Sequence, residues 1–388
     1  MTESTRPLRV MQIIARMNIG GPAIYVTLIE EHLQQRGYDM QLITGNVDSD
    51  EGDMLYYAEE HGVTPTIIPE LGRSLNPLLD LMTIWKLYRL IRQAKPDVVH
   101  TNTAKAGFVG RVASWFARVP VIVHTFHGHV FHGYFSPLKT RLFILLEQIT
   151  ARMSDTIITI TPRLRDELSN TYHIAPESHF TVQAYGLDLA PFAEKTRHAG
   201  DFRNAWQIPL DVPLVGIVAR LVPIKNHLLF LDAVANVHQQ LPEARFVIVG
   251  DGEMREQLEA KVDELGLRDV MTFTGWQKDV ATICADLDVL VISSNNEGIP
   301  FTLIEAMATG CPVVSTNVGG IADLLKNGEL GQMVPKGDAS ALADAVVSTL
   351  NNPPESEKTK AITLQAYGIE RLVNDLDQLY RELLAKKR

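Results

Sequence analysis

The chain has 388 residues, more than one average hydrophobic core can organise, so we expect two domains. Its net charge of −10, from 46 acidic and 36 basic residues, excludes a general nucleic-acid binder. Two cysteines exclude a disulfide framework, and neither a signal peptide nor an apolar run near the ~20 residues of a membrane span is present, so we expect a cytoplasmic protein.

The N-terminal half alternates short apolar runs with helical patterns. Strands are predicted over residues 8–14, 40–44, 97–101, 121–125, 156–161 and 180–185, and helices over 23–35, 78–95 and 139–152. This alternation is typical of a doubly wound parallel sheet. The first loop carries Gly20 and Gly21 but lacks the G-x-G-x-x-G of dinucleotide binders, which argues against a nicotinamide or flavin enzyme.

The periodicity fades between residues 187 and 210, where we place a connection between domains. The first domain is therefore predicted over residues 1–190. Beyond it, strands are predicted over 213–219, 245–249, 270–274 and 287–293, and helices over 226–239, 253–265 and 364–384. A parallel series that restarts after a connection implies a second doubly wound domain, over residues 211–363.

The most informative stretch runs from residue 295 to residue 310. A predicted strand ends at Ser293 and a predicted helix spans 301–309, so Glu297 lies in the loop between them and Glu305 lies within the helix. Gly298 allows close approach of a ligand, and the free N–H groups of a helix N-terminus bind anions. Two carboxylates beside an anion site suit a sugar nucleotide, and a capped amphipathic helix with a solvated acid is the alternative.

Glu297 and Glu305 form an E-x7-E pattern, and the string EGIPFTLIEAMATGCPVVSTNVGG resembles the C-terminal signature of retaining, family 4-like glycosyltransferases. The resemblance implies the GT-B fold, with two Rossmann-like domains across a cleft and a final helix, here 364–388, that returns to the first domain. It also implies transfer from a nucleotide sugar, most commonly a UDP-sugar, to a glycan or polyprenyl-linked acceptor in bacterial cell-surface polysaccharide synthesis. It assigns Glu305 to the ribose and Glu297 to the sugar. Donor-binding roles also fall on Gly298, Ile299, Pro300 and Phe301, and on Gly20 and Gly21, for which a simple tight turn is the alternative.

Arg220 and Lys225 lie between a predicted strand and a predicted helix, at the edge where open α/β sheets bind ligands. Cationic side chains suit a diphosphate leaving group, although two solvated surface bases are the alternative. The pair matches the R-x4-K of the same family, where it neutralises the pyrophosphate. The turns at Gly250, Gly252 and Trp276 end two further strands, and the resemblance places the nucleotide base near them.

Histidines cluster after the predicted strand 121–125, at His124, His127, His129 and His132. A zinc site is disfavoured because no cysteine lies nearby. The resemblance assigns His127 to the reacting sugar. His124 is expected to be packed in the core, and His129 and His132 are candidates for acceptor contacts, as are Asn102, Thr103 and Lys105.

No metal ion or other cofactor is expected. Asp286 and Asp288 have the letters of a D-x-D metal motif, but they are predicted at the junction of a helix and a buried strand. Arg220 and Lys225 make a metal unnecessary for the departing diphosphate.

Two other functions compete with glycosyl transfer. A sugar-nucleotide epimerase shares the architecture, but it would need acid–base carboxylates near Gly20, Thr101 or His127, and none stands out. A non-catalytic sugar-nucleotide-binding module is disfavoured because all four charged residues of the two motifs are present.

Peripheral contact with the inner face of the membrane is left open. Residues 81–95 hold four bases and no acid, and residues 139–152 are rich in apolar side chains. Basic amphipathic segments can attract anionic lipids. The alternative is an ordinary core-facing helix, since Leu81, Ile84, Trp85 and Tyr88 share one helical face.

Overall fold

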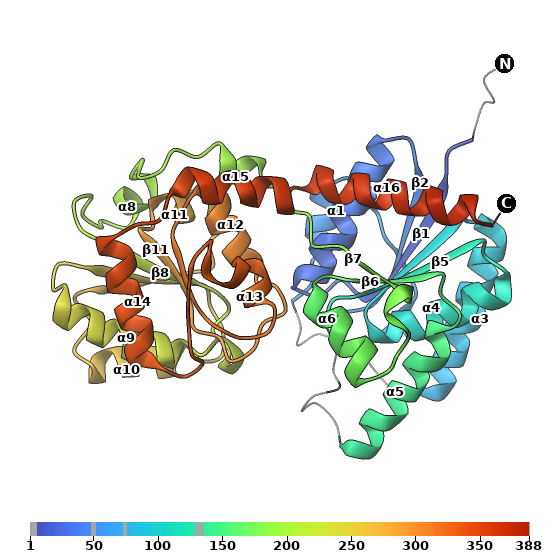
Figure 1. Ribbon diagram of the computed structural model, residues 1–388, viewed down its shortest axis with the longest axis horizontal. Coiled ribbons are helices and arrows are strands. Elements are labelled where there is room, and N and C mark those ends of the chain that lie inside the picture. Colours follow the sequence, from blue (N-terminus) through green and yellow to red (C-terminus); the bar gives the residue numbers. More distant parts are fainter. Residues whose placement is uncertain (1–5, 48–51, 73–75, 129–130, 132–135, 388) are drawn as a thin grey trace. The chain divides into compact units, whose positions relative to one another are not determined.

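The computed structural model describes residues 6–47, 52–72, 76–128, 131 and 136–387. The chain forms two compact units, one made of Met1–Leu187 with Gly368–Arg388 and the other of Asp188–Tyr367. Each unit is a parallel sheet with helices on both faces (Figure 1), which confirms the predicted fold class. Within the described ranges, no helix is both long enough and apolar enough to cross a membrane.

The first unit contains a seven-stranded sheet in the order β3-β2-β1-β4-β5-β6-β7. Its strands are β1 (Arg9–Arg16), β2 (Asp39–Gly45), β3 (Thr66–Ile67), β4 (Val98–Asn102), β5 (Val121–Phe126), β6 (Thr156–Thr159) and β7 (Phe180–Val182). Its helices are α1 (Gly21–Gln35), α2 (Leu55–Glu60), α3 (Pro77–Ala94), α4 (Ala104–Ala117), α5 (Pro137–Ala151), α6 (Pro162–Asp166) and α16 (Ile369–Ala385). In Figure 1, α1 and α16 lie on one side of this sheet and α3, α4 and α5 on the other.

Apolar runs explain the sheet of the first unit. β4 and β5 are buried along their whole length, as expected for central parallel strands covered on both faces. One core cluster joins Met11 and Ile13 of β1 to Leu87 and Ile91 of α3. On the other face, α16 buries one side chain every three or four residues, which is the spacing of a single helical stripe.

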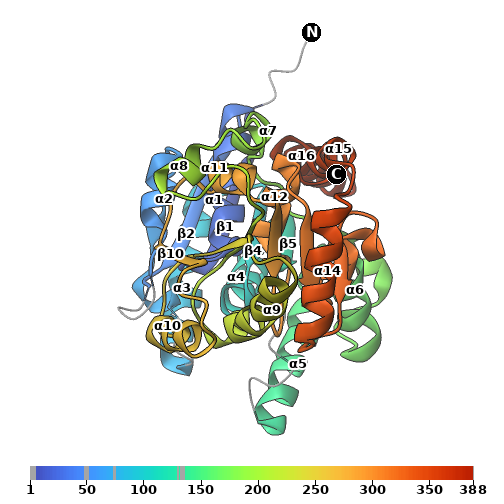
Figure 2. The ribbon, with the colours of Figure 1, turned by 90° about the vertical axis from the view of Figure 1, so that its left-hand side faces the viewer.

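The second unit contains a six-stranded sheet in the order β10-β9-β8-β11-β12-β13. Its strands are β8 (Leu214–Val218), β9 (Arg245–Val249), β10 (Met271–Gly275), β11 (Val289–Ile292), β12 (Val313–Thr316) and β13 (Gln332–Val334). Its helices are α7 (Ala190–Ala193), α8 (Asp201–Ala205), α9 (His227–Gln240), α10 (Arg255–Glu264), α11 (Val280–Asp286), α12 (Phe301–Thr309), α13 (Ile321–Leu324), α14 (Ala339–Asn351) and α15 (Ser356–Tyr367). α9 and α14 lie side by side over the core of this unit (Figure 2).

The borders of the units differ from the sequence-based borders. Residues 188–210, read as a connection, belong to the second unit, because buried Asp286 accepts backbone N–H groups from Gly200, Phe202 and Arg203. The helix predicted over 364–384 is divided at Gly368, whose backbone is extended. Its first turn belongs to α15 of the second unit, and the remainder is α16 of the first.

Burial also decides how helix α3 faces the core. Helix α3 does pack on the core, as the core-facing alternative expected, but through a rotated face. Leu87 and Ile91 are buried and Ile84 is half-buried against the core. Leu81, Trp85 and Tyr88 of the predicted face are exposed.

Candidate functional site

The predicted donor-binding residues of the second unit gather at one edge of its sheet. Four parallel strands, β10, β9, β8 and β11, are neighbours, so their carboxyl ends lie side by side. Arg220 follows β8, Gly250 and Gly252 follow β9, Trp276 follows β10, and Glu297 follows β11. Ligands of open parallel sheets bind outside this edge.

Lys225 and Glu297 form an ion pair at this edge. The Lys225 Nζ donates to Glu297 Oε1 at 2.6 Å, and the Ser294 hydroxyl donates to the same oxygen at 2.6 Å. The Lys225 and Glu297 side chains are 23% and 9% exposed, so the pair is largely shielded from water. The backbone N–H of Asn295 donates to the Ile224 carbonyl at 2.8 Å, which ties the two loops together.

The Arg220 side chain is exposed and makes no hydrogen bond or ion pair with another described residue, whereas its backbone carbonyl accepts a hydrogen bond from the Val222 N–H at 2.9 Å. Its loop is positioned by the two glycines after β9. A Cβ on Gly250 would lie 2.1 Å from the Ala219 carbonyl oxygen, and one on Gly252 would lie 2.6 Å from that of Leu221. These glycines therefore allow the backbone of the Arg220 loop to approach the backbone of the β9 turn closely. The unpaired guanidinium of Arg220 is available to bind an anion.

The loop 297–300 is held by a second glycine pair. A Cβ on Gly319 would lie 1.6 Å from the Glu297 carbonyl oxygen, and the Gly320 N–H donates to the Gly298 carbonyl at 3.0 Å. Helix α12 then begins at Phe301, with Pro300 as its N-cap residue. The positive end of the α12 dipole thus follows the loop that carries Glu297.

Glu305 lies in α12 without a hydrogen-bond or ion-pair partner among the described residues. Burial raises the pKa of its carboxyl group to about 7, because the charged form is poorly solvated. A carboxyl group of this kind gains from ligand hydroxyls that donate to it.

Trp276 leaves 60% of its surface exposed beside the Gly250 turn. The Gly250 N–H donates to the Gly275 carbonyl at 2.9 Å, which joins the turns after β9 and β10. A flat, exposed aromatic ring at this edge is available for stacking.

In the first unit, Gly20, Gly21 and His127 lie at the carboxyl edge of the sheet. Gly20 is the N-cap residue of α1, which Gly21 begins. His127 directly follows β5; its Nε2 lies 3.0 Å from Asn102 Oδ1 and its Nδ1 lies 2.9 Å from the Tyr185 hydroxyl. Burial lowers the pKa of His127 to about 3, so the imidazole is neutral near pH 7.

Most of the remaining candidates of the first unit have structural partners or lie outside the description, whereas the buried Thr103 hydroxyl has no hydrogen-bond partner among the described residues. His124 is fully buried and packs against Gly107 and Thr101, as expected. Lys105 is paired with Asp80 at 3.1 Å. Residues His129 and His132 lie outside the described ranges.

Asp286 and Asp288 have structural partners, as their position between α11 and β11 suggests. Asp286 accepts the backbone N–H groups noted above. Asp288 accepts from Arg203 at 2.7 Å and from the Leu214 N–H at 2.6 Å. Across the described ranges, no three His, Cys, Asp or Glu side chains are grouped so as to hold a metal ion.

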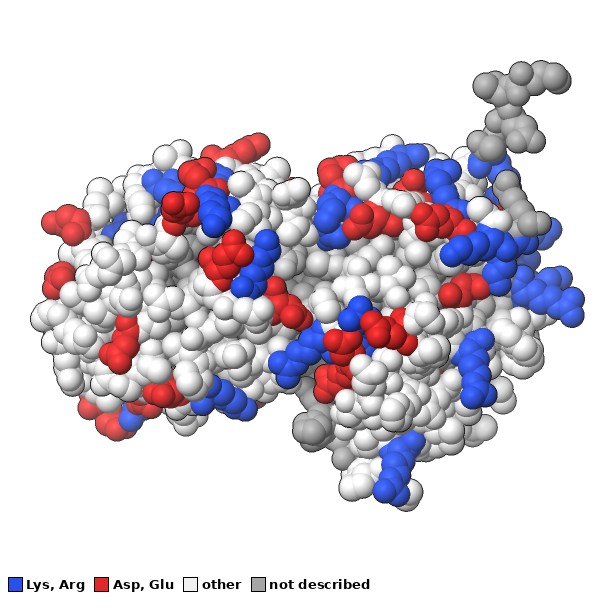
Figure 3. Space-filling view, in the orientation of Figure 1, with Lys and Arg blue, Asp and Glu red and all other residues white. Residues whose placement is uncertain are grey.

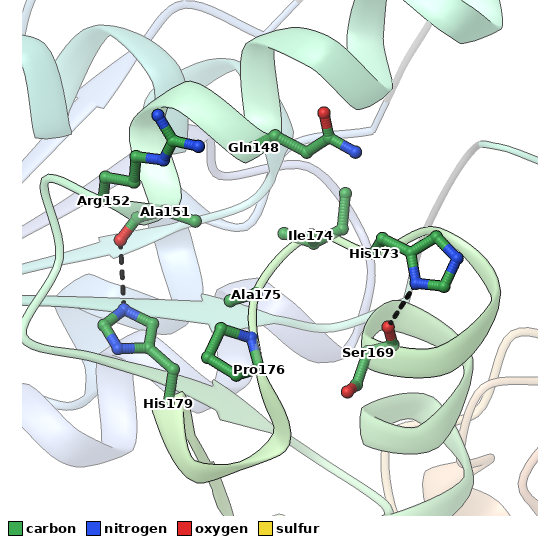
Figure 4. A pocket seen from close by; sticks show the side chains of 9 residues that line it. All are labelled: Gln148, Ala151, Arg152, Ser169, His173, Ile174, Ala175, Pro176 and His179. Atoms are coloured by element: carbon green, nitrogen blue, oxygen red, sulfur yellow. Dashed lines mark hydrogen bonds between the residues drawn. The ribbon is translucent and has the colours of Figure 1, made fainter.

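A separate pocket of about 470 Å³ opens in the first unit between the end of α5 and the segment before β7 (Figure 4). Arg152, His173 and His179 contribute its polar side chains. His173 is bonded to the Ser169 carbonyl and His179 to the Ala151 carbonyl. None of the predicted site residues lines this pocket.

Family models of known proteins match both units of the chain. The family model described as "Glycosyl transferases group 1" matches residues 199–366, and the model "Glycosyl transferase 4-like domain" matches residues 20–186. The chain belongs to this glycosyltransferase family. The enzyme is thus a glycosyltransferase of the GT-B fold, as the sequence motifs predicted.

Characterised relatives of this glycosyltransferase span nearly its whole length. It is 27% identical over 365 residues to the Escherichia coli UDP-Gal:alpha-D-GlcNAc-diphosphoundecaprenol alpha-1,3-galactosyltransferase, covering 92% of each chain. It is 25% identical over 329 residues to the capsular polysaccharide biosynthesis glycosyltransferase CapM of Staphylococcus aureus, covering 83% of each. The solved structure of Anabaena HepE in complex with UDP has a TM-score of 0.81 at 21% identity, covering 97% of this chain and 100% of that one.

Sequence reasoning missed two participants. Ser294 supports Glu297, and Tyr185 contacts His127. The Tyr25 ring only packs edge-on against the His127 ring, at a ring separation of 4.9 Å. Tyr185 lies 58 positions from His127, so no local pattern could have joined them. Ser294, by contrast, adjoins the recognised motif and could have been suspected.

Proposed function

We propose that this glycosyltransferase moves a sugar from a UDP-sugar to a glycan or polyprenyl-linked acceptor with retention of anomeric configuration. The observation that carries the proposal is the shielded Lys225–Glu297 pair beside an unpaired Arg220, at the edge where four strands end. The name of the Escherichia coli relative, which specifies a UDP-sugar and a diphosphoundecaprenol-linked acceptor, supports the substrate classes.

The basic side chains are assigned to the diphosphate leaving group, and the carboxylates are assigned to the ribose and the sugar. Arg220 and Lys225 would bind the diphosphate oxygens, where negative charge increases as the bond from the anomeric carbon to phosphate breaks. Glu305 would accept hydrogen bonds from the ribose hydroxyls, and Glu297 would accept them from the hydroxyls of the sugar. The acceptor oxygen bonds to the anomeric carbon from the same face, and its proton passes to the departing phosphate oxygen.

No metal ion is assigned to this reaction. Two basic side chains and the N-terminus of α12 supply positive charge for the diphosphate. Activity in EDTA, compared with activity in added Mg²⁺ or Mn²⁺, tests this assignment. Loss of transfer in EDTA with recovery on adding metal would overturn it.

The decisive experiment measures acceptor-dependent transfer. Purified enzyme is incubated with each of several UDP-sugars, including UDP-galactose, UDP-glucose and UDP-GlcNAc, with and without a polyprenyl-diphosphate-linked sugar. We expect a glycosylated lipid and free UDP only when the acceptor is present. Conversion of the nucleotide sugar to an epimer without acceptor would instead identify the epimerase alternative.

Substitutions of the diphosphate-binding side chains separate catalysis from folding. Arg220→Ala and Lys225→Ala should each lower kcat/KM by about 100-fold, since a charge-assisted contact to developing charge contributes about 3 kcal/mol. Arg245→Ala, on the amino side of β9, is a matched control. Unchanged kcat/KM in both site variants would exclude the assigned role.

Peripheral contact with an anionic membrane is the remaining part of the proposal. Large exposed apolar side chains of the first unit gather on α3, the end of α4 and α5, namely Leu78, Leu81, Met82, Trp85, Tyr88, Trp115, Phe116, Leu138, Leu142, Leu145 and Ile149. The second unit exposes only Leu210, Ile224 and Trp276 among its described large apolar residues. Such a concentration supports insertion into a lipid interface.

The charges around this apolar surface favour anionic lipid. The same helices expose Arg89, Arg92, Lys95, Arg118, Lys139, Arg141 and Arg152. Their two acids are neutralised, Asp80 by Lys105 and buried Glu147 by Arg111. Figure 3 accordingly shows blue and white atoms, but no red ones, over the projecting end of α5.

Vesicle sedimentation tests this contact. Binding should require anionic lipid, and Arg89→Glu with Arg92→Glu should weaken it roughly 30-fold, at about 1 kcal/mol for each base lost. Lys326→Glu with Lys336→Glu makes the same change of charge on the second unit and should have little effect. Equal binding to neutral and anionic vesicles, or equal losses in both double variants, would exclude a contact directed by anionic lipid, and the proposed glycosyltransferase activity would stand.

A further inference from the structure

Both nitrogens of His127 are engaged by side chains of the first unit. Asn102, at the end of β4, contacts Nε2, and Tyr185, beyond β7, contacts Nδ1. The Tyr185 ring stacks on the imidazole at an interplanar angle of 11°, so the two rings form one rigid pair. Any role of this histidine therefore depends on which nitrogen carries the proton.

The orientation of Asn102 decides the tautomer. Its Nδ2 faces the His100 carbonyl at 3.5 Å, a contact that would become repulsive if the amide were reversed. Asn102 therefore presents Oδ1, which can only accept, to His127. It follows that His127 Nε2 carries the proton and that Nδ1 accepts from the Tyr185 O–H.

We infer that Asn102 and Tyr185 are positioning residues that hold His127 in the neutral Nε2–H tautomer, so that the imidazole meets the substrate as a hydrogen-bond donor and not as a base. Asn102 Oδ1 accepts the hydrogen bond from the Nε2 proton, and a sugar oxygen would replace it as the acceptor. The Tyr185 O–H continues to donate its hydrogen bond to Nδ1 when the sugar is bound. The part of this inference that concerns catalysis rests on the proposed function, whereas the tautomer does not.

The surroundings keep the ring neutral. His100 on β4 and His124 on β5 face the ring and are themselves buried and neutral. Tyr25 and Tyr185 are buried phenols whose pKa values are raised by desolvation. The permanent charges of this region act on the neighbours of the ring, Arg371 of α16 on Tyr25 and Arg111 on His124, and no carboxylate within the described residues contributes to the shift of the His127 pKa.

Helix α16 fixes the Tyr185 end of the network. Arg371 donates to the Ala184 and Tyr185 carbonyls at 2.7 Å each. Gly186 then passes close to the helix, because a Cβ there would lie 2.5 Å from the Leu372 side chain. These contacts fix the backbone of Tyr185 against α16, and the fixed backbone helps to direct the phenol O–H toward Nδ1.

Nitrogen NMR of the full-length enzyme labelled with ¹⁵N-histidine reads the tautomer directly. The His127 signals are identified by their loss in His127→Gln. We expect a protonated Nε2 and an unprotonated Nδ1 from about pH 5 to pH 9, since the pKa lies near 3. A proton on Nδ1 in the wild-type enzyme would overturn the inference.

Three substitutions test the positioning role. Tyr185→Phe keeps the stacked ring but removes the O–H, and should introduce a second tautomer and lower kcat about tenfold with little change in KM. Asn102→Asp places a carboxylate at Nε2, which should raise the pKa of His127. The NMR spectrum should then show a doubly protonated ring near neutral pH. Tyr25→Phe is the control, because the Tyr25 hydroxyl faces Thr125 but makes no hydrogen bond of normal geometry in the described structure.

The outcomes distinguish this inference from the proposed function. Equal kcat values in Tyr185→Phe and Tyr25→Phe, with an unchanged tautomer, would overturn the positioning role. If the spectra match expectation but the wild-type enzyme transfers no sugar from any UDP-sugar, the proposed function fails and the tautomer assignment stands.

Discussion

The titration of Glu305 offers a test of its proposed hydrogen bonds with the ribose of the donor. Its pKa is raised by burial from 4.5 to about 7. Between these values the folded protein keeps a proton that the unfolded chain has lost, so this group lowers the stability of the fold as pH rises from 4.5 to 7. Ligand hydroxyls that donate to the carboxylate would favour its charged form and oppose this loss.

We predict that the affinity for a UDP-sugar rises with pH up to about 7 and then levels off. Binding that requires the ionised carboxylate improves by up to about tenfold per pH unit below the pKa of the free enzyme. Isothermal titration calorimetry between pH 5.5 and 8 measures the effect. Glu305→Gln should bind more weakly and without this pH dependence; the same slope in that variant would refute the role of the carboxyl group.

At the scale of elements, the site depends on loops that approach one another more closely than side chains allow. The turn before α13 passes so near the Glu297 loop that Gly319 leaves no room for a Cβ. Gly319 also has a φ of +54°, in the left-handed region. Substitution there combines backbone strain with a collision, and the two contributions can be separated.

We predict that Gly319→Ala displaces the Glu297 loop and weakens UDP-sugar binding by at least tenfold, whereas Gly266→Ala does not. Gly266 has a similar φ of +69°, with no atom within 4 Å of an added Cβ, so it reports strain alone. Both variants should lose about 1 kcal/mol of stability from strain. Calorimetry for binding and thermal unfolding for stability provide the measurements, and equal affinities in the two variants would contradict the prediction.

At the scale of the whole molecule, the first unit is built from two separated parts of the chain. Residues 368–388 complete it, whereas the second unit is continuous over 188–367. Tyr380 of α16 is fully buried and bonded to His100 at 2.7 Å, and Lys387 pairs with Asp155 at 2.7 Å. The C-terminal segment is thus part of the core of the N-terminal fold.

We predict that truncation after Tyr367 destabilises the first unit selectively. Loss of α16 exposes the face covered by Leu372, Leu376 and Tyr380, so amide hydrogen exchange should accelerate in β1, β4 and β5 and remain slow in β8 and β9. In the full chain, Leu376→Ala should cost about 2–5 kcal/mol, and exposed Gln378→Ala should cost little. Uniformly faster exchange in both units would argue against separate cores.

Local patterns in the sequence were enough to predict the fold class and the main elements. The predicted helix 301–309 coincides with α12, because its residues share one apolar periodicity between Pro300 and Gly310. The strands before Arg220 and Glu297 were found for the same reason, since buried parallel strands are short, apolar and bounded by turns. Motif spacing then identified the glycosyltransferase family.

Tertiary structure alone decided which of these residues meet. Lys225 and Glu297 are 72 positions apart, and they pair because β8 and β11 are neighbours, although β9 and β10 lie between them in the chain. His127 depends on Tyr185 from the segment after β7, and residues 188–210 join the second unit through buried Asp286. The spacing of apolar residues shows which side of each segment faces a core. The partners across that core are set by strand order and packing, and these cannot be read from a single sequence.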